Sequence, residues 1–169
     1  MVSGVITALM LVSVYLLFFS PFFVVDSVEV VGAQRLTSID INQAMGLAGE
    51  TIFAIDPEVV QQRLETAFPE LKSFELAIGL PHTIVLSVVE RTPLIAWIQN
   101  EEEVWVDDEG VGFMPRGEVE GLLRVNAQGL PPGAELVGTN EDLLLPPELV
   151  ETTLALRAYL PEGAKLMYQ

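Results

Sequence analysis

Cysteine is absent from this chain of 169 residues, and histidine occurs once. Without cysteine the chain has no disulfides, no thiol nucleophile and no thiolate metal site. Basic residues are also few, because 8 Lys and Arg stand against 24 Asp and Glu, which gives a net charge of -16. A surface this acidic repels nucleic acid and anionic membrane surfaces, which argues against both as partners.

Charged residues are missing from Val2 to Val25, where the sequence reads VSGVITALMLVSVYLLFFSPFFVV. A helix of that length reaches roughly 36 Å, more than the hydrocarbon core of about 30 Å. A cleaved signal peptide would begin with basic residues, whereas the first basic residue here is Arg35. We therefore predict an uncleaved transmembrane helix over residues 1–25, with the N-terminus in the cytoplasm and the acidic remainder outside the cell membrane.

A short strand and two helices are predicted after this segment. Valines alternate with polar residues over residues 27–32, which is the period of a strand. Thr37 resembles the start of a capping box, and apolar positions follow it at helical spacing over residues 37–49. The dipeptide Asp-Pro that opens residues 56–69 predicts a second helix, because aspartate caps a helix and proline suits its first position.

The remaining sequence predicts further strands and one helix. Alternating residues 74–78 and 84–88 flank a short loop and indicate a hairpin, so the order up to residue 92 is β-α-α-β-β. Beyond it we predict strands joined by polar turns over residues 94–113, an ordered loop over residues 129–138 and a helix over residues 146–160. The terminal residues LMYQ are typical of the start of another strand.

The stretch SVVERTPLIAWIQN contains an adjacent acid and base, Glu90 and Arg91, followed by Pro93. Neighbours on a strand point to opposite faces, so these two residues are not an acid–base pair for one substrate. Proline has no N–H to donate to a sheet and marks the end of the strand. We predict a structural junction between two domains at Glu90, Arg91 and Pro93, with direct partner contact as the alternative.

Other candidate sites have ordinary structural explanations. His82 lies in the predicted hairpin loop without a second ligand or a base, so we expect an exposed turn residue. The acidic residues 107–109 lack the spacing of a calcium loop and indicate a polar turn, as do residues 101–103. The glycines of residues 46–50 lack the Gly-Lys-Ser/Thr of a phosphate loop. We therefore predict no catalytic, cofactor-binding or metal-binding residues, and no enzyme.

Taken in order, these motifs resemble the bacterial cell division family FtsQ, also called DivIB. The resemblance rests on the N-terminal apolar segment, V-x-V-x-G at residues 28–32, two short helices, a hairpin with Leu-Pro at its turn, E-R-x-P at residues 90–93 and V-D-x-x-G at residues 106–110. It implies an α+β chain with a transmembrane helix over residues 1–25, a β-α-α-β-β POTRA-like domain over residues 26–92 and a partial FtsQ-type β domain over residues 93–169. We expect the last to be mainly antiparallel, with one helix, and incomplete at its C-terminus.

The resemblance also implies a function. It predicts a non-catalytic, single-pass membrane scaffold at the division septum that recruits septal membrane proteins, with FtsB and FtsL as expected partners and no cofactor or small-molecule substrate. Its candidate partner-binding element is the second POTRA strand, an edge strand that would accept a partner strand by β-augmentation. This strand consists of Lys72, Ser73, Phe74, Glu75, Leu76, Ala77, Ile78 and Gly79.

Two alternatives come from other classes of protein. A component of outer-membrane protein assembly or secretion also uses POTRA domains, and it predicts repeated units before a β-barrel. A membrane-anchored exported enzyme predicts a convergent cluster of nucleophile, base or metal ligands, for which the sequence offers no candidates.

Overall fold

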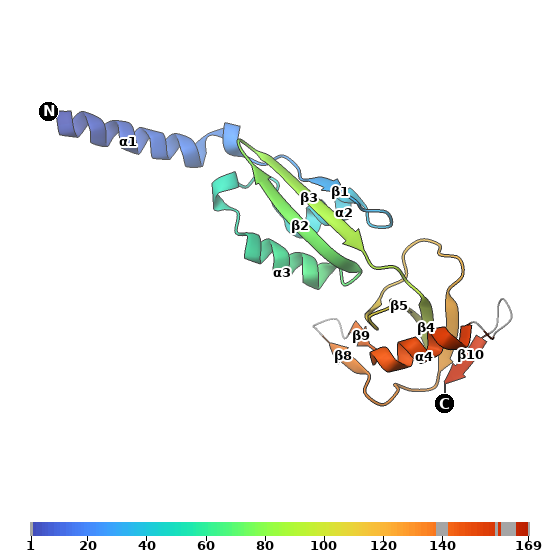
Figure 1. Ribbon diagram of the computed structural model, residues 1–169. Coiled ribbons are helices and arrows are strands. Elements are labelled where there is room, and N and C mark those ends of the chain that lie inside the picture. Colours follow the sequence, from blue (N-terminus) through green and yellow to red (C-terminus); the bar gives the residue numbers. More distant parts are fainter. Residues whose placement is uncertain (1, 138–141, 158, 160–164, 169) are drawn as a thin grey trace. The chain divides into compact units, whose positions relative to one another are not determined.

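The computed structural model describes residues 2–137, 142–157, 159 and 165–168, and it shows an α+β chain with mixed sheets (Figure 1). The chain divides into two compact units. Unit 1 comprises residues 1–65 and 73–89, and unit 2 comprises residues 66–72 and 90–169. Each unit has its own sheet and its own helices, so each is described separately.

The expected membrane-spanning helix over residues 1–25 is not supported by the structure. Helix α1 runs from Val2 to Phe19, which is 18 residues and therefore about 27 Å. It ends where Ser20 accepts a hydrogen bond from the backbone of Phe22 and Pro21 opens a short 3-10 helix, η1 (Pro21–Phe23). Across the described residues, no helix combines the length and the apolar character needed to cross a membrane.

Unit 1 confirms the predicted β-α-α-β-β order. After α1 and η1, its elements are β1 (Glu29–Val31), α2 (Ser38–Met45), η2 (Ile52–Ala54), α3 (Pro57–Ala67), β2 (Leu71–Gly79) and β3 (Thr83–Glu90). The last two residues of α3 and the first two of β2 fall in unit 2. The three strands form one sheet in the order β1-β3-β2, with β1 parallel to β3, so β2 lies at one edge.

Local signals explain where the helices of unit 1 begin and end. The Thr37 hydroxyl accepts a hydrogen bond from the backbone N–H of Asp40 at 3.1 Å and caps α2. Gly46 ends this helix in the left-handed conformation, with φ of 63°. The Asp56 carboxylate accepts from the N–H of Glu58 at 3.0 Å, as expected of an N-cap before proline.

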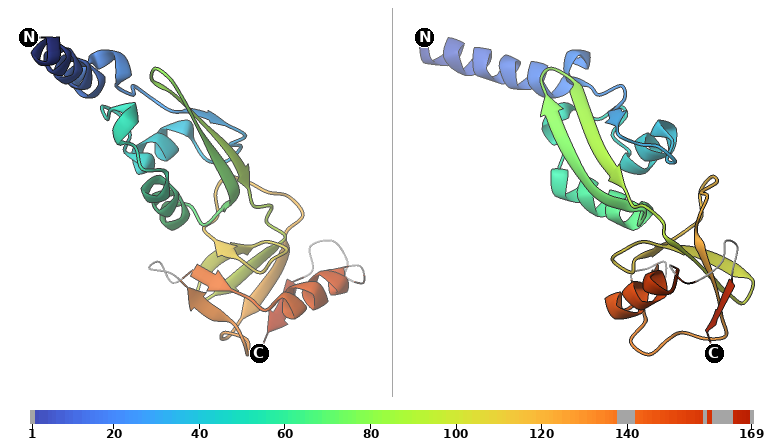
Figure 2. Two further views of the ribbon diagram at one scale, coloured as in Figure 1. Left: turned by 60° about the vertical axis from the view of Figure 1, so that its left-hand side comes forward. Right: turned by 45° about the vertical axis from the view of Figure 1, so that its right-hand side comes forward.

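Helices α2 and α3 cover the same face of the sheet, as Figure 2 shows. Alternate residues of β3 are buried on this face, while Ser87 and Val89 between them are exposed. The core of the unit consists of Val25, Val28, Leu36, Ile41, Met45, Leu47, Ile52, Val60, Leu64, Ile84, Leu86 and Val88. The period-2 pattern of β3 and the helical spacing of α2 and α3 therefore bury one apolar layer.

Unit 2 contains a five-stranded sheet in the order β10-β7-β4-β5-β6. Its strands are β4 (Ile95–Gln99), β5 (Glu102–Val106), β6 (Gly112–Phe113), β7 (Leu123–Ala127) and β10 (Lys165–Tyr168), and β8 (Glu135–Val137) pairs with β9 (Asp142–Leu144). The pairs β4–β5 and β5–β6 are antiparallel, whereas β7 is parallel to both β4 and β10. The domain was expected to be mainly antiparallel, and three of the five strand pairs among its described residues are antiparallel. The five-stranded sheet is nevertheless mixed, because β7 pairs in parallel on both sides and is reached by a crossover, not by a hairpin.

Some sequence predictions for unit 2 need correction. The loop predicted over residues 129–138 contains β8, and Gly138 lies outside the described residues. Strand β7, of five residues, and strand β9, of three, were not predicted. The predicted helix over residues 146–160 is α4 (Pro147–Arg157), with Leu160 outside the described residues. The expected final strand is β10, and Gln169 lies outside the described residues.

The sheet of unit 2 is covered on both faces. One face carries the larger core, made of Ile95, Trp97, Val106, Val125, Ala127, Leu143, Leu145 and Val150, the last from α4. The other face carries Ala96, Trp105 and Phe113, with Val119 and Leu122 packed against them. Burial on both faces explains why β4 reads as a continuous apolar run rather than an alternating one.

Candidate functional site

Arg91 lies at the centre of a charged cluster in unit 2, directly after β3 ends. Its guanidinium Nη1 forms ion pairs with Asp107 and with Glu109, the latter at 2.8 Å. Its Nε donates to the carbonyl of Pro69 at 3.2 Å, and its backbone N–H donates to the carbonyl of Glu70 at 2.8 Å. One residue therefore holds the segment before β2 and the turn after β5 together.

Asp107 is the buried member of this cluster, with a side chain that is 0% exposed. One carboxylate oxygen, Oδ2, accepts from Arg91, and the other accepts from the backbone N–H groups of Glu109 at 3.0 Å and Val111 at 2.9 Å. Both oxygens are thus satisfied, which is what a buried carboxylate requires. The carboxylate shapes the turn after β5 and fixes the position of the guanidinium.

Gly110 completes the same turn and explains the form of the V-D-x-x-G motif. Its φ of 85° is in the left-handed region, and a Cβ at this position would lie 2.2 Å from the carbonyl oxygen of Leu145. The backbone N–H of Leu145 donates to the Gly110 carbonyl at 2.8 Å, so two backbone segments meet here. Val106 before Asp107 is fully buried. Each named position of the motif therefore has a structural reason.

Two further basic residues extend the cluster. Lys72 forms an ion pair with Glu109 at 3.1 Å and with Asp108 at 3.5 Å. Arg116 forms an ion pair with Glu70 at 2.9 Å, and its guanidinium lies 5.9 Å from the centroid of the Phe68 ring.

The charges of the cluster shift one another's titration. The hydrogen bond from Arg91, followed by that from Lys72, lowers the pKa of Glu109 below its ordinary value. The hydrogen bond to Glu109 raises the pKa of Lys72, although burial works in the opposite direction. Burial also opposes the charge of Arg91, but the hydrogen bonds to Glu109 and Asp107 outweigh it and raise the pKa of Arg91 overall. These three shifts favour the charged forms of Glu109, Lys72 and Arg91 in the folded protein.

This geometry is suited to holding a fold together. The acidic and basic groups pair with one another, and the buried carboxylate accepts hydrogen bonds at both of its oxygens. Glu90 is the last residue of β3 and is half-buried, while Pro93 is buried in the segment that leads to β4. The structure brings Arg91 together with Asp107, which the sequence had indicated only as part of a polar turn. The V-D-x-x-G motif was the signal that pointed to this residue.

The candidate partner-binding strand, β2, lies at the edge of its sheet, so one side of its backbone is not paired with another strand of the sheet. In the three-stranded sheet, β2 is bonded to β3 only. Phe74 and Leu76 are half-buried, and the exposed positions include Glu75, Ala77 and Ile78. That a partner strand binds here stays a prediction.

The single histidine is exposed, as its place in the loop predicted. Its Nδ1 lies 3.2 Å from the carbonyl oxygen of Phe22, and its ring makes an edge contact with the Phe22 ring. No group of three His, Asp or Glu side chains suited to a metal ion occurs in the part of the chain that the structure describes.

Comparison with known proteins places these motifs in a family context. Residues 23–91 match the family model described as "POTRA domain, FtsQ-type". This FtsQ-type POTRA segment contains the unit 1 sheet, both of its helices and Arg91. The match supports the resemblance on which the sequence predictions relied.

The chain is also similar to curated proteins named "Cell division protein FtsQ". It is 33% identical to that of Streptomyces collinus over 100 residues, covering 59% of this chain and 38% of the relative. It is 33% identical to that of Chloroflexus aurantiacus over 141 residues, covering 80% and 51%. With that of Streptomyces bingchenggensis the identity is 30% over 172 residues, covering 98% and 61%. The chain thus spans between about two fifths and three fifths of the length of these FtsQ relatives.

Proposed function

We propose that this protein is a non-catalytic scaffold of the bacterial cell division machinery. The observation that carries the proposal is the FtsQ-type POTRA match over residues 23–91, together with relatives that are named cell division proteins. The charged cluster fits a structural role, because its members are paired with one another. In this proposal the protein acts at the division site of the cell membrane, and residues 26–92 and 93–169 are its two working domains.

The proposed mechanism is recruitment through the exposed side of β2. A strand at a sheet edge presents unpaired backbone N–H and C=O groups, and a partner strand extends the sheet by bonding to them. Lys72, Glu75 and Gly79 limit indiscriminate pairing, because charge and glycine weaken edge-to-edge association. By resemblance to the family, FtsB and FtsL are the partners to test first.

A fluorescent fusion in the native bacterium, combined with depletion of the protein, tests the division role. We expect the fusion to concentrate at the division site and depleted cells to grow into filaments, because septation would lack a scaffold. Fluorescence spread uniformly over the cell envelope, together with normal division after depletion, would contradict the proposal. If depletion instead reduces the level of outer-membrane proteins while cells divide normally, a role in outer-membrane assembly is favoured.

Proline substitutions test the recruiting role of β2. Successive N–H groups along an edge strand point alternately toward the sheet and away from it, and proline removes one of them. Of Ala77→Pro and Ile78→Pro, we expect one to unfold unit 1 and the other to leave it folded. The folded variant should lose interaction with FtsB or FtsL in a two-hybrid assay. If the folded proline variant, which lacks the outward N–H, still interacts fully with FtsB and FtsL, the β2 edge is not their binding site.

A further inference from the structure

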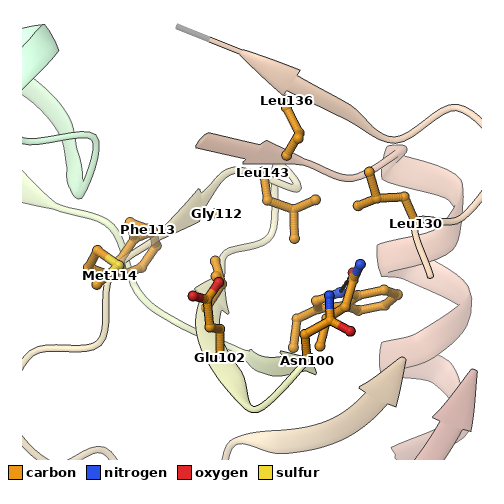
Figure 3. A pocket seen from close by; sticks show the side chains of 11 residues that line it. Asn100, Glu102, Gly112, Phe113, Met114, Leu130, Leu136 and Leu143 are labelled. Atoms are coloured by element: carbon orange, nitrogen blue, oxygen red, sulfur yellow. Dashed lines mark hydrogen bonds between the residues drawn. The ribbon is translucent and has the colours of Figure 1, made fainter. Parts of the chain in front are cut away.

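A pocket of about 320 Å³ opens in unit 2, away from the Arg91 cluster. Its size is at the lower end of the range of ligand pockets, roughly 300–1,000 Å³, so it suits one large side chain better than a cofactor. Figure 3 shows side chains from the β4–β5 turn, β6, Leu130 and the β8–β9 pair arranged around it. Nothing in the proposed division role or the POTRA match uses this pocket.

The floor of the pocket is apolar and rigid. Trp97 of β4 and Val104 of β5 are direct partners in the antiparallel register, and Leu143 of β9 lies beside them. Trp97 is only 3% exposed, and its Nε1 donates to Gln99 at 3.3 Å, which fixes the indole. Trp97 and Leu143 are buried and Val104 is half-buried, so most of this floor is held by packing within the protein. Pre-formed pockets of this kind bind with the least ordering cost.

Three exposed apolar side chains stand around the opening. Met114 is 69% exposed, Leu136 50% and Leu130 43%, and they come from three separate segments of the chain. Scattered exposed leucines are common on protein surfaces, but convergence of several on one concavity marks a binding surface. A buried anchor surrounded by a less buried apolar rim is the arrangement of protein–peptide hot spots.

Charge at one end of the pocket defines the ligand further. Among the described residues that line the pocket, Glu102 is the only charged one, and it is exposed. Glu101 precedes it, and the two-residue turn holds Asn100 and Glu101 at φ of 52° and 70°. Turns of this type are usually built from Asn and Gly, so Glu101 holds its left-handed backbone at a conformational cost. The electrostatic preference is for a positive charge next to an apolar group.

We propose that this pocket binds a peptide segment of a partner protein in which a large aliphatic side chain is adjacent to lysine or arginine. The aliphatic side chain fills the space between Trp97, Val104 and Leu143, and the basic residue lies against Glu102. The inference goes beyond the proposed division role, because it uses a different unit and does not require the β2 edge.

Binding of labelled peptides to the full chain tests the proposal by fluorescence anisotropy. The probe is an eight-residue fluorescein peptide of Ser and Gly with one central leucine between two lysines. A peptide with alanine in place of the leucine should bind about tenfold more weakly, because the buried aliphatic contact is lost. A peptide with glutamate in place of both lysines should bind more weakly still, since attraction to Glu102 becomes repulsion.

Variants of the chain locate the binding site. Leu136→Ser and Leu130→Ser should each weaken binding of the leucine peptide by about fivefold or more, as should Glu102→Lys. The matched controls are Leu156→Ser, an exposed leucine of α4, and Glu120→Lys, an exposed acid outside the pocket; both should leave the affinity within about twofold. All five positions are at the surface, and circular dichroism with a thermal melt verifies that each variant is folded.

Four results would overturn the proposal. Equal affinity for the leucine and alanine peptides would show that the pocket is not used, and equal weakening by Glu102→Lys and Glu120→Lys would show only general charge attraction. Self-association in light scattering that Leu136→Ser abolishes would assign the surface to a second copy of the chain. Binding to phosphatidylcholine vesicles that Leu136→Ser abolishes, without peptide binding, would assign it to lipid.

Discussion

Arg91 donates to Asp107, a carboxylate with a fully buried side chain that lies 16 residues further along the chain. The same guanidinium reaches the Pro69 carbonyl, so it links three segments that are distant in sequence. An ion pair of this kind becomes costly when one member is removed, because the other remains buried and uncompensated. The stability of unit 2 therefore depends on this pair more than on its exposed ion pairs.

We expect Arg91→Met to reduce the free energy of unfolding of unit 2 by about 3–5 kcal/mol, because Asp107 is left without its cation. Urea unfolding followed by tryptophan fluorescence measures this directly, since Trp97 and Trp105 are the two tryptophans of the chain and both lie in unit 2. The control is Arg124→Met, whose ion pair with Glu103 is partly exposed and should be worth less than about 1 kcal/mol. Equal losses in the two variants would contradict the prediction.

The lowered pKa of Glu109 predicts an acid-dependent part of the stability. A carboxylate with a folded pKa below its unfolded value stabilises the fold fully above the unfolded value, near 4.5, and this contribution is lost as the pH falls through the folded value. Glu109→Gln should therefore destabilise unit 2 at pH 7 and flatten its stability profile below pH 4.5. Urea midpoints measured from pH 7 to pH 3 test this. The same slope in Glu109→Gln and in the unsubstituted chain would disprove it, and Glu118→Gln is the control.

Gly110→Ala should destabilise unit 2 by about 3 kcal/mol or more, because a left-handed φ is combined with a clash against the Leu145 carbonyl. Gly117→Ala is a matched control, since Gly117 has φ of 73° but open space within 4 Å of the point where a Cβ would stand. Its cost should be only the left-handed strain of about 1–2 kcal/mol. Thermal melts of the two variants separate the cost of the left-handed backbone from the cost of the clash with Leu145. Similar melting temperatures would show that the short distance between Gly110 and the Leu145 carbonyl does not limit stability.

Glu101→Gly should stabilise unit 2 by about 1 kcal/mol, because glycine adopts the φ of 70° without strain. Differential scanning calorimetry would show a rise in Tm of a few degrees. Glu118→Gly removes an equivalent charge at a position without positive φ, and it should not raise Tm. A decrease in Tm for Glu101→Gly would mean that the glutamate makes a stabilising contact that outweighs its strain.

Unit 1 was the more predictable half of the chain. Its helices are marked by local signals, such as Thr37 and Asp56 at their starts, and these caps act within three residues of the helix they begin. The strand pattern of β3 was predictable because only one of its faces is buried. In each case the physical cause of the element lies inside the element itself.

Unit 2 was less predictable because its strands are short and several pair in parallel with distant partners. Residues of β7 pair with β4, about 28 positions earlier, and with β10, about 41 positions later, so no turn sequence marks either pairing. The E-R-x-P and V-D-x-x-G motifs were recognised separately, yet nothing local predicts that Arg91 and Asp107 meet. The pocket likewise combines residues from β4, β5, β6, β8, β9 and three connecting segments.

The sequence by itself determined the caps, the apolar faces and the strand periods, because these depend on neighbours within one or two turns of the chain. It also contains the V-x-V-x-G motif of residues 28–32, which lies within the segment that matches the FtsQ-type POTRA model. The tertiary structure decided that β2 lies at an edge, that the larger sheet is mixed, and that Asp107 is buried against Arg91. These features depend on which distant segments of the chain come into contact. Burial in those contacts then determines how much each charge and each apolar side chain contributes to the free energy of folding.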